Sequence, residues 1–182
     1  MLTEENLQDI FEIADLLSEG NRDIFIQLKE SVFASDPNHI LDLLEGILSP
    51  EAFDAFLDRV GEVEKDNLLL ILLALLEHNR YVCVRPRKDR LFDFIAAFDC
   101  LQPVRNAGIL LKLDSAGLEE TGNVPDWAAI IDEKYAIEQY CLAAVEMNAD
   151  QYHLLFGKIA SLARVQKLFA NLGYRLDYAK NM

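Results

Sequence analysis

The first 62 residues alternate between short apolar stripes and polar breaks, a pattern that is typical of helices. An amphipathic helix places its apolar side chains three or four positions apart. Four stripes in a row follow this spacing, so the pattern predicts four short helices before Gly61. The stripes are Leu7, Ile10, Phe11, Ala14 and Leu17; Ile24, Phe25, Leu28 and Val32; Ile40, Leu41, Leu44, Ile47 and Leu48; and Phe53, Phe56, Leu57 and Val60.

Polar residues between the stripes supply start and stop signals. Thr3 can accept a hydrogen bond from the first turn of a helix, and the pair Gly20-Asn21 ends that helix. The pairs Asp36-Pro37 and Ser49-Pro50 start the third and fourth helices, because Asp and Ser are good N-caps and Pro suits the first helical position.

A fifth helix is expected over residues 65–78, around an uninterrupted apolar run from Leu68 to Leu76. Its leucine-rich content favours helix over strand. A run of this length covers about 13.5 Å of helix, against roughly 30 Å of membrane hydrocarbon, so we expect a helix buried on all sides. Asn79 is a plausible left-handed residue to end it.

After Asn79 the pattern changes to shorter elements of both kinds. Residues 81–84 are partly β-branched and predict a strand that Pro86 limits. Asp89 could then cap a helix, and residues 109–113 are interpreted as a strand. The apolar positions of that helix are Leu91, Phe92, Ile95, Ala96 and Phe98.

The last third contains the most ambiguous segments. Residues 127–138 predict a helix, and residues 140–147 fit either a strand or a continuation of it. Asp150 could cap a further helix through Leu154, Leu155, Ile159 and Leu162, and residues 165–172 continue helically. Gly173 ends that helix, and the alternation in residues 174–178 predicts a final strand.

These elements predict an α+β fold that is predominantly helical. We expect a helical N-terminal half packed on a small mixed β-sheet with flanking helices in the C-terminal half, within a single domain of residues 1–182. A faint internal echo pairs residues 72–84 with 166–178, and 80–94 with 139–156. Both duplication of an αβ unit and coincidence of common turn signals explain this echo.

The charge of the chain also changes after Asn79, where the pattern of elements changes. The formal net charge is −14, and residues 1–79 hold 18 Asp or Glu against 4 Lys or Arg, whereas residues 80–182 hold 13 of each. An acidic half of this kind serves solubility or attracts a basic partner. Direct binding of nucleic acid is disfavoured, because phosphate contact needs a net basic face.

The exception is the stretch RYVCVRPRKDR at residues 80–90, which gathers Arg85, Arg87, Lys88 and Arg90. Three interpretations stand: ion pairs with the acidic N-terminal helices, contact with an anion or an acidic partner, or solvated surface. Trp127 follows the turn-rich residues 114–126 and either covers the core or contacts a partner.

Motifs of known chemistry are missing from the sequence. It contains no phosphate-binding loop, GxGxxG, GxSxG or HExxH. The histidines His39, His78 and His153 and the cysteines Cys83, Cys100 and Cys141 are widely spaced. We therefore expect no intrinsic metal, no cofactor, no membrane segment and reduced thiols, as in a soluble cytoplasmic protein.

The sequence thus favours a non-catalytic protein-interaction module, an acidic inhibitor or immunity-type protein that binds a basic partner. Its expected partner face carries Glu5, Asp9 and Glu12, which lie off the first apolar stripe. The alternative is a small-anion-binding protein or enzyme with a site near residues 85–90 and 114–127. Nothing in the sequence supports a homo-oligomer. An interaction module exposes an apolar or acidic patch, whereas an enzyme needs a pocket where titratable groups converge.

Overall fold

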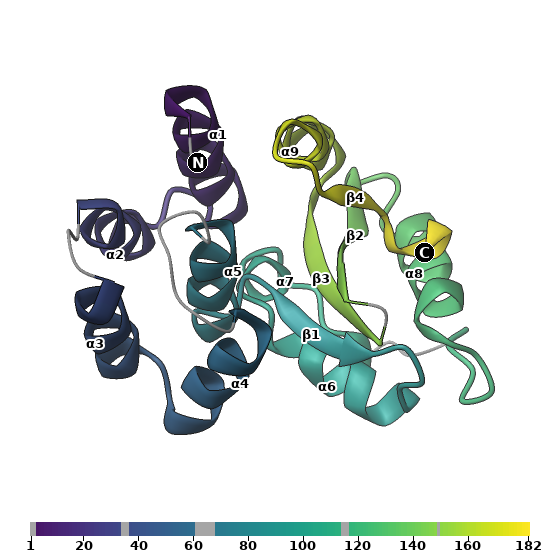
Figure 1. Cartoon of the computed structure of the whole chain (residues 1–182). Helices are drawn as coiled ribbons and strands as arrows, with labels where there is room; N and C mark the ends of the chain where they lie inside the picture. The colour runs from purple at the N-terminus through teal and green to yellow at the C-terminus, as the bar shows by residue number, and fades with distance from the viewer. Residues whose placement is uncertain (1–2, 34–36, 61–67, 114–116, 149) are drawn as a thin grey trace. The chain divides into compact units, whose positions relative to one another are not determined.

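A computed structural model of the chain describes residues 3–33, 37–60, 68–113, 117–148 and 150–182. The chain divides into two compact units, Met1–Asn79 and Arg80–Met182. Figure 1 shows that the first unit is built of helices and that the second contains the sheet. This boundary coincides with the change of charge in the sequence.

The described residues of the first unit form five helices, as the apolar stripes predict. The central helix α5 packs against α1, α2 and α4. Eight of the nine residues from Leu68 to Leu76 are buried, so the expected buried apolar helix is confirmed. The helices are α1 (Glu4–Leu17), α2 (Arg22–Phe33), α3 (Pro37–Ile47), α4 (Pro50–Val60) and α5 (Leu68–His78).

The cap signals explain where these helices begin and end. The side chain of Thr3 accepts a hydrogen bond from the backbone N–H of Asn6 at 3.1 Å, and the hydroxyl of Ser49 accepts one from that of Ala52 at 3.2 Å. At the end of α5, the Asn79 side chain donates to the Leu75 carbonyl at 2.8 Å. The left-handed residue is Arg80, with φ of 66°, and not Asn79 as expected. The expected cap at Asp36 lies outside the described residues.

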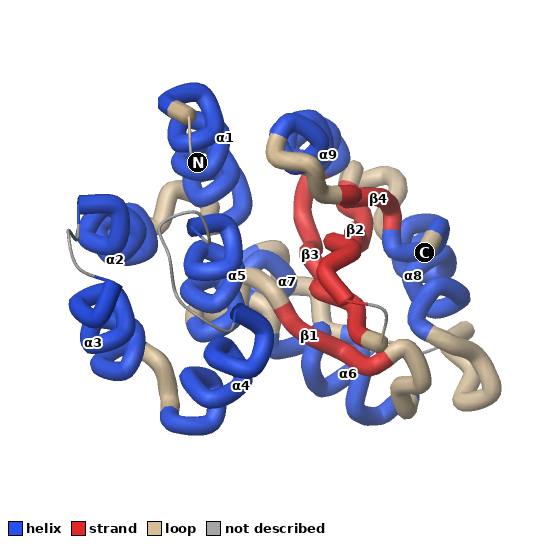
Figure 2. The backbone as a smooth tube through the Cα atoms, viewed as in Figure 1, coloured by secondary structure: helices blue, strands red, loops and turns tan. Residues whose placement is uncertain are grey.

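The second unit is built around a four-stranded sheet in the order β1-β3-β2-β4. The strands among its described residues are β1 (Cys83–Pro86), β2 (Tyr140–Asn148), β3 (Gln151–Lys158) and β4 (Arg175–Tyr178). All three pairings are antiparallel, whereas the sequence led us to expect a mixed sheet. The reason is that β2 and β3 form a hairpin, and β1 and β4 add to its two sides (Figure 2).

Helices cover both faces of this sheet. One face packs its Leu142, Leu154 and Phe156 side chains into a core with Phe94 and Trp127. Helix α9 contacts β2, β3 and β4 on the opposite face (Figure 1). The α-helices of this unit are α6 (Leu91–Cys100), α7 (Gln102–Asn106), α8 (Val124–Lys134) and α9 (Ile159–Asn171), with short 3₁₀ turns η2 (Leu111–Leu113) and η3 (Ala179–Asn181).

The helix expected from Asp150 onward is wrong over its first half. Residues Gln151–Lys158 form β3, and α9 begins only at Ile159. Strand β3 is central and five consecutive residues, Tyr152–Phe156, are buried. A strand buried on both faces has a continuous apolar run, so it lacks the alternation that identifies a strand in sequence. The echo between residues 80–94 and 139–156 fails for the same reason, because the second stretch is a hairpin.

The strand expected at residues 109–113 is also wrong, because this segment contains the 3₁₀ turn η2. The Asp99 carboxylate accepts hydrogen bonds from the backbone N–H groups of Leu111, at 2.7 Å, and Lys112, at 3.0 Å. These are donors that a strand would offer to a neighbouring strand. The open question at residues 140–147 resolves as strand β2, and the final strand is confirmed as β4.

Candidate functional site

The basic cluster lies where strand β1 turns into helix α6. Arg85 at the end of β1 donates two hydrogen bonds to Asp89, at 2.6 Å and 2.5 Å. The Asp89 side chain is only 2% exposed, and its carboxylate also accepts from the backbone N–H of Arg90 at 2.9 Å. The hydrogen bond to Asp89 raises the pKa of Arg85 above its already high value, against the effect of burial. Arg85 therefore holds this turn together.

The other three cations of the cluster lie at the surface. Arg87 donates its backbone N–H to the Asp150 carbonyl at 3.0 Å, and its guanidinium lies over the Tyr152 ring at 5.0 Å. Arg90 pairs with Asp93 at 2.8 Å, with 85% of its side chain exposed. Lys88 is exposed. The ion pairs shown for Arg85 and Arg90 are thus local to the turn and to α6.

Trp127 is a core residue, which agrees with the first of the two interpretations that the sequence left open. Its side chain is fully buried, 5.1 Å from the Phe94 ring centroid, and its indole N–H donates to the Glu119 carbonyl at 2.8 Å. A capping box between Asn123 and Asp126 starts α8, and Trp127 belongs to the buried face of this helix. Residues 114–116 of the preceding loop lie outside the described residues.

Of the three acids expected on the partner face of α1, Glu5 is exposed, Glu12 is half-buried and Asp9 is buried at 8% exposure. The placement of Asp9 on an exposed face is therefore wrong. The predicted stripe omitted Ile13, which is fully buried and lies one turn after Asp9. Including Ile13 turns the inward face of α1 toward Asp9.

Exposed carboxylates are instead distributed over the helices of the first unit. Among the described side chains of residues 1–79, the exposed cations are Arg22 and Lys29. We use the name acidic surface for the exposed acids of the same residues, which are Glu4, Glu5, Asp15, Glu19, Asp23, Glu30, Asp42, Glu45, Glu51, Asp54 and Asp58.

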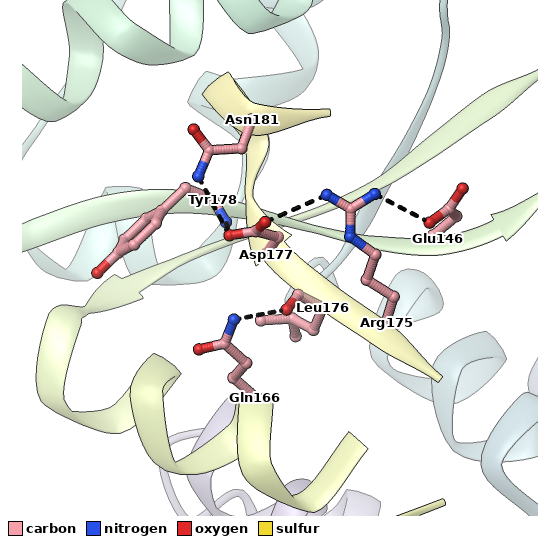
Figure 3. A network of polar contacts seen from close by, with 7 residues as sticks. All are labelled: Glu146, Gln166, Arg175, Leu176, Asp177, Tyr178 and Asn181. Carbon is pink, nitrogen blue, oxygen red and sulfur yellow. Dashed lines mark hydrogen bonds and ion pairs between the residues drawn. The ribbon is translucent and has the colours of Figure 1, made fainter. Parts of the chain in front are cut away.

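Sequence reasoning missed a polar network around β4, drawn in Figure 3. Arg175 bridges Asp177, at 3.2 Å, and Glu146 on β2, at 3.4 Å. Partial burial opposes ionisation of Asp177, but hydrogen bonds from the Tyr178 backbone N–H, Asn181 and Arg175 outweigh it and lower the pKa of Asp177. The alternation Arg175-x-Asp177 places both side chains on one face of a strand, and this was the available signal.

A small hollow beside this network does not resemble an active site. It lies between α9 and β4, and the titratable groups among its lining residues are Asp177 and Tyr178. The remaining lining residues are Ala143, Leu162, Ala163, Gln166 and Leu176. Gln166 donates to the Leu176 carbonyl at 2.9 Å and so joins α9 to the strand.

A second polar group that the sequence did not reveal is buried beside β2. One oxygen of Asp132 accepts from the backbone N–H of Leu142 at 2.8 Å, and the other lies 3.4 Å from the Lys180 ammonium. Burial raises the pKa of Asp132. Burial, with the nearby Asp132 charge, also raises the pKa of Cys141 to about 12. Cys141 therefore remains a thiol at neutral pH and is a poor nucleophile.

The described part of the chain holds no group of three or more His, Cys, Asp or Glu side chains that could bind a metal ion. None of its helices has both the length and the apolar content that crossing a membrane requires.

Comparisons with known proteins place the chain in a family. No curated protein and no solved structure matches it. One family model matches residues 9–179, which extend over nearly all of both units. The chain therefore belongs to the family described as Domain of unknown function (DUF6630).

Proposed function

We propose that this protein is a non-catalytic interaction module that binds a basic protein partner through its acidic surface. Inhibitor and immunity-type proteins act in this way, by covering a basic partner. The observation on which the proposal rests is the charge of the exposed side chains that the structure describes in the first unit, eleven carboxylates against the two cations Arg22 and Lys29.

The physical role of such a surface is to attract a partner over distance. A concentrated negative field accelerates encounter with a positive partner and repels acidic ones. Solubility alone would be served equally well by acids spread over the whole chain. Here the second unit is neutral, with 13 acids and 13 bases over residues 80–182, so the surplus charge belongs to one unit.

The polar groups of the second unit support a non-catalytic role because they are engaged in holding the fold. Arg85 binds Asp89, Asp132 binds the Leu142 backbone, and burial keeps Cys141 protonated. The alternative of an anion site or enzyme at residues 85–90 and 114–127 is weaker. Of its five expected contacts, Arg85 is bound to Asp89 in the β1–α6 turn, and Trp127 is buried in the core.

We place the protein in the cytoplasm as part of the same proposal. Cys83, Cys100 and Cys141 are all free thiols. Free thiols persist where the compartment is reducing.

The experiment isolates the native partner from the source cell with a tagged chain and then measures association kinetics with the purified pair. The test variant is the triple Glu5→Lys/Glu45→Lys/Asp54→Lys, at exposed positions of α1, α3 and α4. The control is Glu120→Lys/Glu133→Lys/Glu138→Lys, at exposed positions of the second unit. Each replacement shifts the charge by two, so both variants carry −8 in place of −14.

We expect the association rate of the wild-type chain to fall steeply as salt is raised, while the dissociation rate changes little. The test variant should associate about tenfold more slowly at low salt, and the control much less so. An acidic partner, or a rate that salt does not change, would overturn the proposal.

A further inference from the structure

Helix α2 exposes a group of large apolar side chains. Phe25 is 47% exposed, Ile26 is 41% exposed and Phe33 is 73% exposed. Single exposed apolar residues are normal, but three within one short helix form a cluster of the kind that marks an interaction site. We call Phe25, Ile26 and Phe33 the α2 ridge.

The ridge points away from the core of its unit. The inward face of α2 is made by Ile24, Leu28 and Ser31, which are all buried. Ile26 and Phe33 are seven positions apart, close to two full turns, so they lie on one line about 10.5 Å apart. That line is on the side of the helix opposite the buried residues.

Phe25 joins the ridge to helix α1. Its ring lies 5.3 Å from the ring of Phe11, at an interplanar angle of 57°. Phe11 is itself half-buried. Phe25 is therefore anchored on one side, whereas the side chains of Ile26 and Phe33 project from α2.

Charged side chains line the two sides of the ridge. Asp23 and Glu30 are exposed and stand three positions before and four positions after Ile26, which puts them on the same strip of helix surface. On the other side, the Lys29 ammonium lies 6.0 Å from the centre of the Phe33 ring. At this distance the ammonium lies at the outer limit of a cation–π contact with the ring.

We propose that the α2 ridge receives an arginine-bearing amphipathic helix of the basic partner. The inference rests on the proposed function and names the part of the partner that the acidic unit recognises. Apolar side chains of that helix pack between Ile26 and Phe33. Its arginines pair with Asp23 and Glu30. Arginine fits this surface better than lysine, because its planar group both stacks on aromatic rings and pairs with carboxylates.

The spacing of the ridge favours a helical segment over an extended one. Two apolar anchors seven residues apart on α2 match the repeat of a second helix lying along it. The charge argues against other occupants of the ridge. A second copy of the chain would also carry −14, and an anionic membrane surface is negative as well, so both are repelled.

The test uses a synthetic peptide as the probe. The peptide is about 20 residues long, above the roughly 12–15 residues that a helix needs in water, with leucines along one face and arginines beside them. Its binding to the full chain is followed by fluorescence anisotropy at low and at physiological salt. Companion peptides replace every arginine by lysine, every arginine by glutamate, or every leucine by glutamine.

We expect Phe33→Ala and Ile26→Ala each to weaken binding of the arginine–leucine peptide by about tenfold, as for anchors at the centre of an interface. Because these side chains are exposed, the melting temperature should hardly change. The matched control is Phe92→Ala, which removes a 77% exposed ring from α6 and should bind the peptide as the wild-type chain does. The lysine peptide should bind more weakly, and the glutamate and glutamine peptides should not bind.

The failures of the two proposals can be told apart. If the arginine–leucine peptide does not bind, or binds Phe33→Ala and Ile26→Ala as tightly as the wild-type chain, the ridge proposal is overturned. The broader proposal then still stands if the native partner associates more slowly with Glu5→Lys/Glu45→Lys/Asp54→Lys. If that triple variant associates like wild type, the acidic surface itself is not the binding surface.

Discussion

In the second unit three acidic side chains bind backbone N–H groups of the fold, whereas in the first unit most of the described acidic side chains are simply exposed. Asp89, Asp99 and Asp132 each accept hydrogen bonds from backbone N–H groups within residues 80–182. Residues 1–79 hold 18 acids against 4 bases, and eleven of those whose side chains the structure describes are exposed. The same residue type thus serves two purposes, depending on whether it is buried with a donor or left on a surface.

The two units also differ in what holds them together. The first is built on the aliphatic helix α5, whose buried leucines and isoleucine contribute mainly by removal from water. Its surplus charge opposes compactness through self-repulsion. The second has an aromatic core with Phe94, Phe98 and Trp127. Hydrogen bonds to the carboxylates of Asp89 and Asp99 join separate segments of it. The comparison predicts that substitutions in the two units will lower stability for different physical reasons.

The largest effect is expected at the centre of α5. Leu72 is fully buried, so Leu72→Asp places an unpaired charge in an aliphatic core and should unfold the first unit, at a cost above about 4 kcal/mol. Circular dichroism and thermal melting measure this. Leu70→Asp, at a half-buried position of the same helix, is the matched control and should cost less. A normal melting curve for Leu72→Asp would mean that the buried core around α5 is not what stabilises the first unit.

A smaller effect is expected at the β1–α6 turn, where two ion pairs can be compared. Arg85→Ala leaves the Asp89 carboxylate, whose side chain is 2% exposed, without its ion-pair partner. This substitution should lower the free energy of unfolding by about 2–3 kcal/mol. Arg90→Ala breaks an exposed pair with Asp93 and should cost less than about 0.5 kcal/mol. Denaturant unfolding gives both values. Equal losses of unfolding free energy would contradict the view that the buried ion pair stabilises the fold more than the exposed one.

Asp132 should impose a pH dependence on the second unit. Burial raises its pKa, so the folded state binds the proton more readily than the unfolded state does. Between the ordinary Asp value of about 3.9 and the raised pKa, stability therefore falls as pH rises. Asp132→Asn keeps an oxygen for the Leu142 N–H but carries no charge, so its stability at pH 7 should change by no more than about 1 kcal/mol.

The measurement is the difference in unfolding free energy between wild type and Asp132→Asn across that pH range. The wild-type chain should gain stability relative to the variant as pH is lowered toward about 4. A difference that is constant with pH would show that the folded state does not disfavour the Asp132 charge.

The smallest stability change is expected on the acidic surface. Glu5→Lys/Glu45→Lys/Asp54→Lys should raise stability at low salt by a few tenths of a kcal/mol, because it relieves self-repulsion. High salt should shrink this gain, since the screening length falls from about 10 Å at 0.1 M to about 3 Å at 1 M. Glu120→Lys/Glu133→Lys/Glu138→Lys should bring no gain, because the second unit is already balanced. A large loss from the first triple would show that these acids are structural.

Much of the fold was predictable because its signals are local. Apolar spacing and the caps at Thr3 and Ser49 located the helices of the first unit. Strand β3 was missed because a central strand shows no alternation, and η2 was missed because its partner, Asp99, lies twelve positions before Leu111. Long-range hydrogen bonds leave no periodic signal in the sequence.

The candidate site was predicted less well than the fold. The charge asymmetry is a property of the sequence, but exposure depends on the rotation of each helix. One omitted residue, Ile13, was enough to place the buried Asp9 on the wrong face of α1. The α2 ridge was missed because Phe25 was counted as part of the buried stripe of its helix, whereas it is 47% exposed.

The most direct test of the account is the association rate of the native partner with the two triple variants at low and at high salt. Both variants carry the same net charge, so only the position of the charge differs. We expect Glu5→Lys/Glu45→Lys/Asp54→Lys to associate about tenfold more slowly than the control at low salt, and the difference to disappear near 1 M salt. Equal rates for the two variants at low salt would contradict the claim that the first unit carries its surplus charge in order to bind.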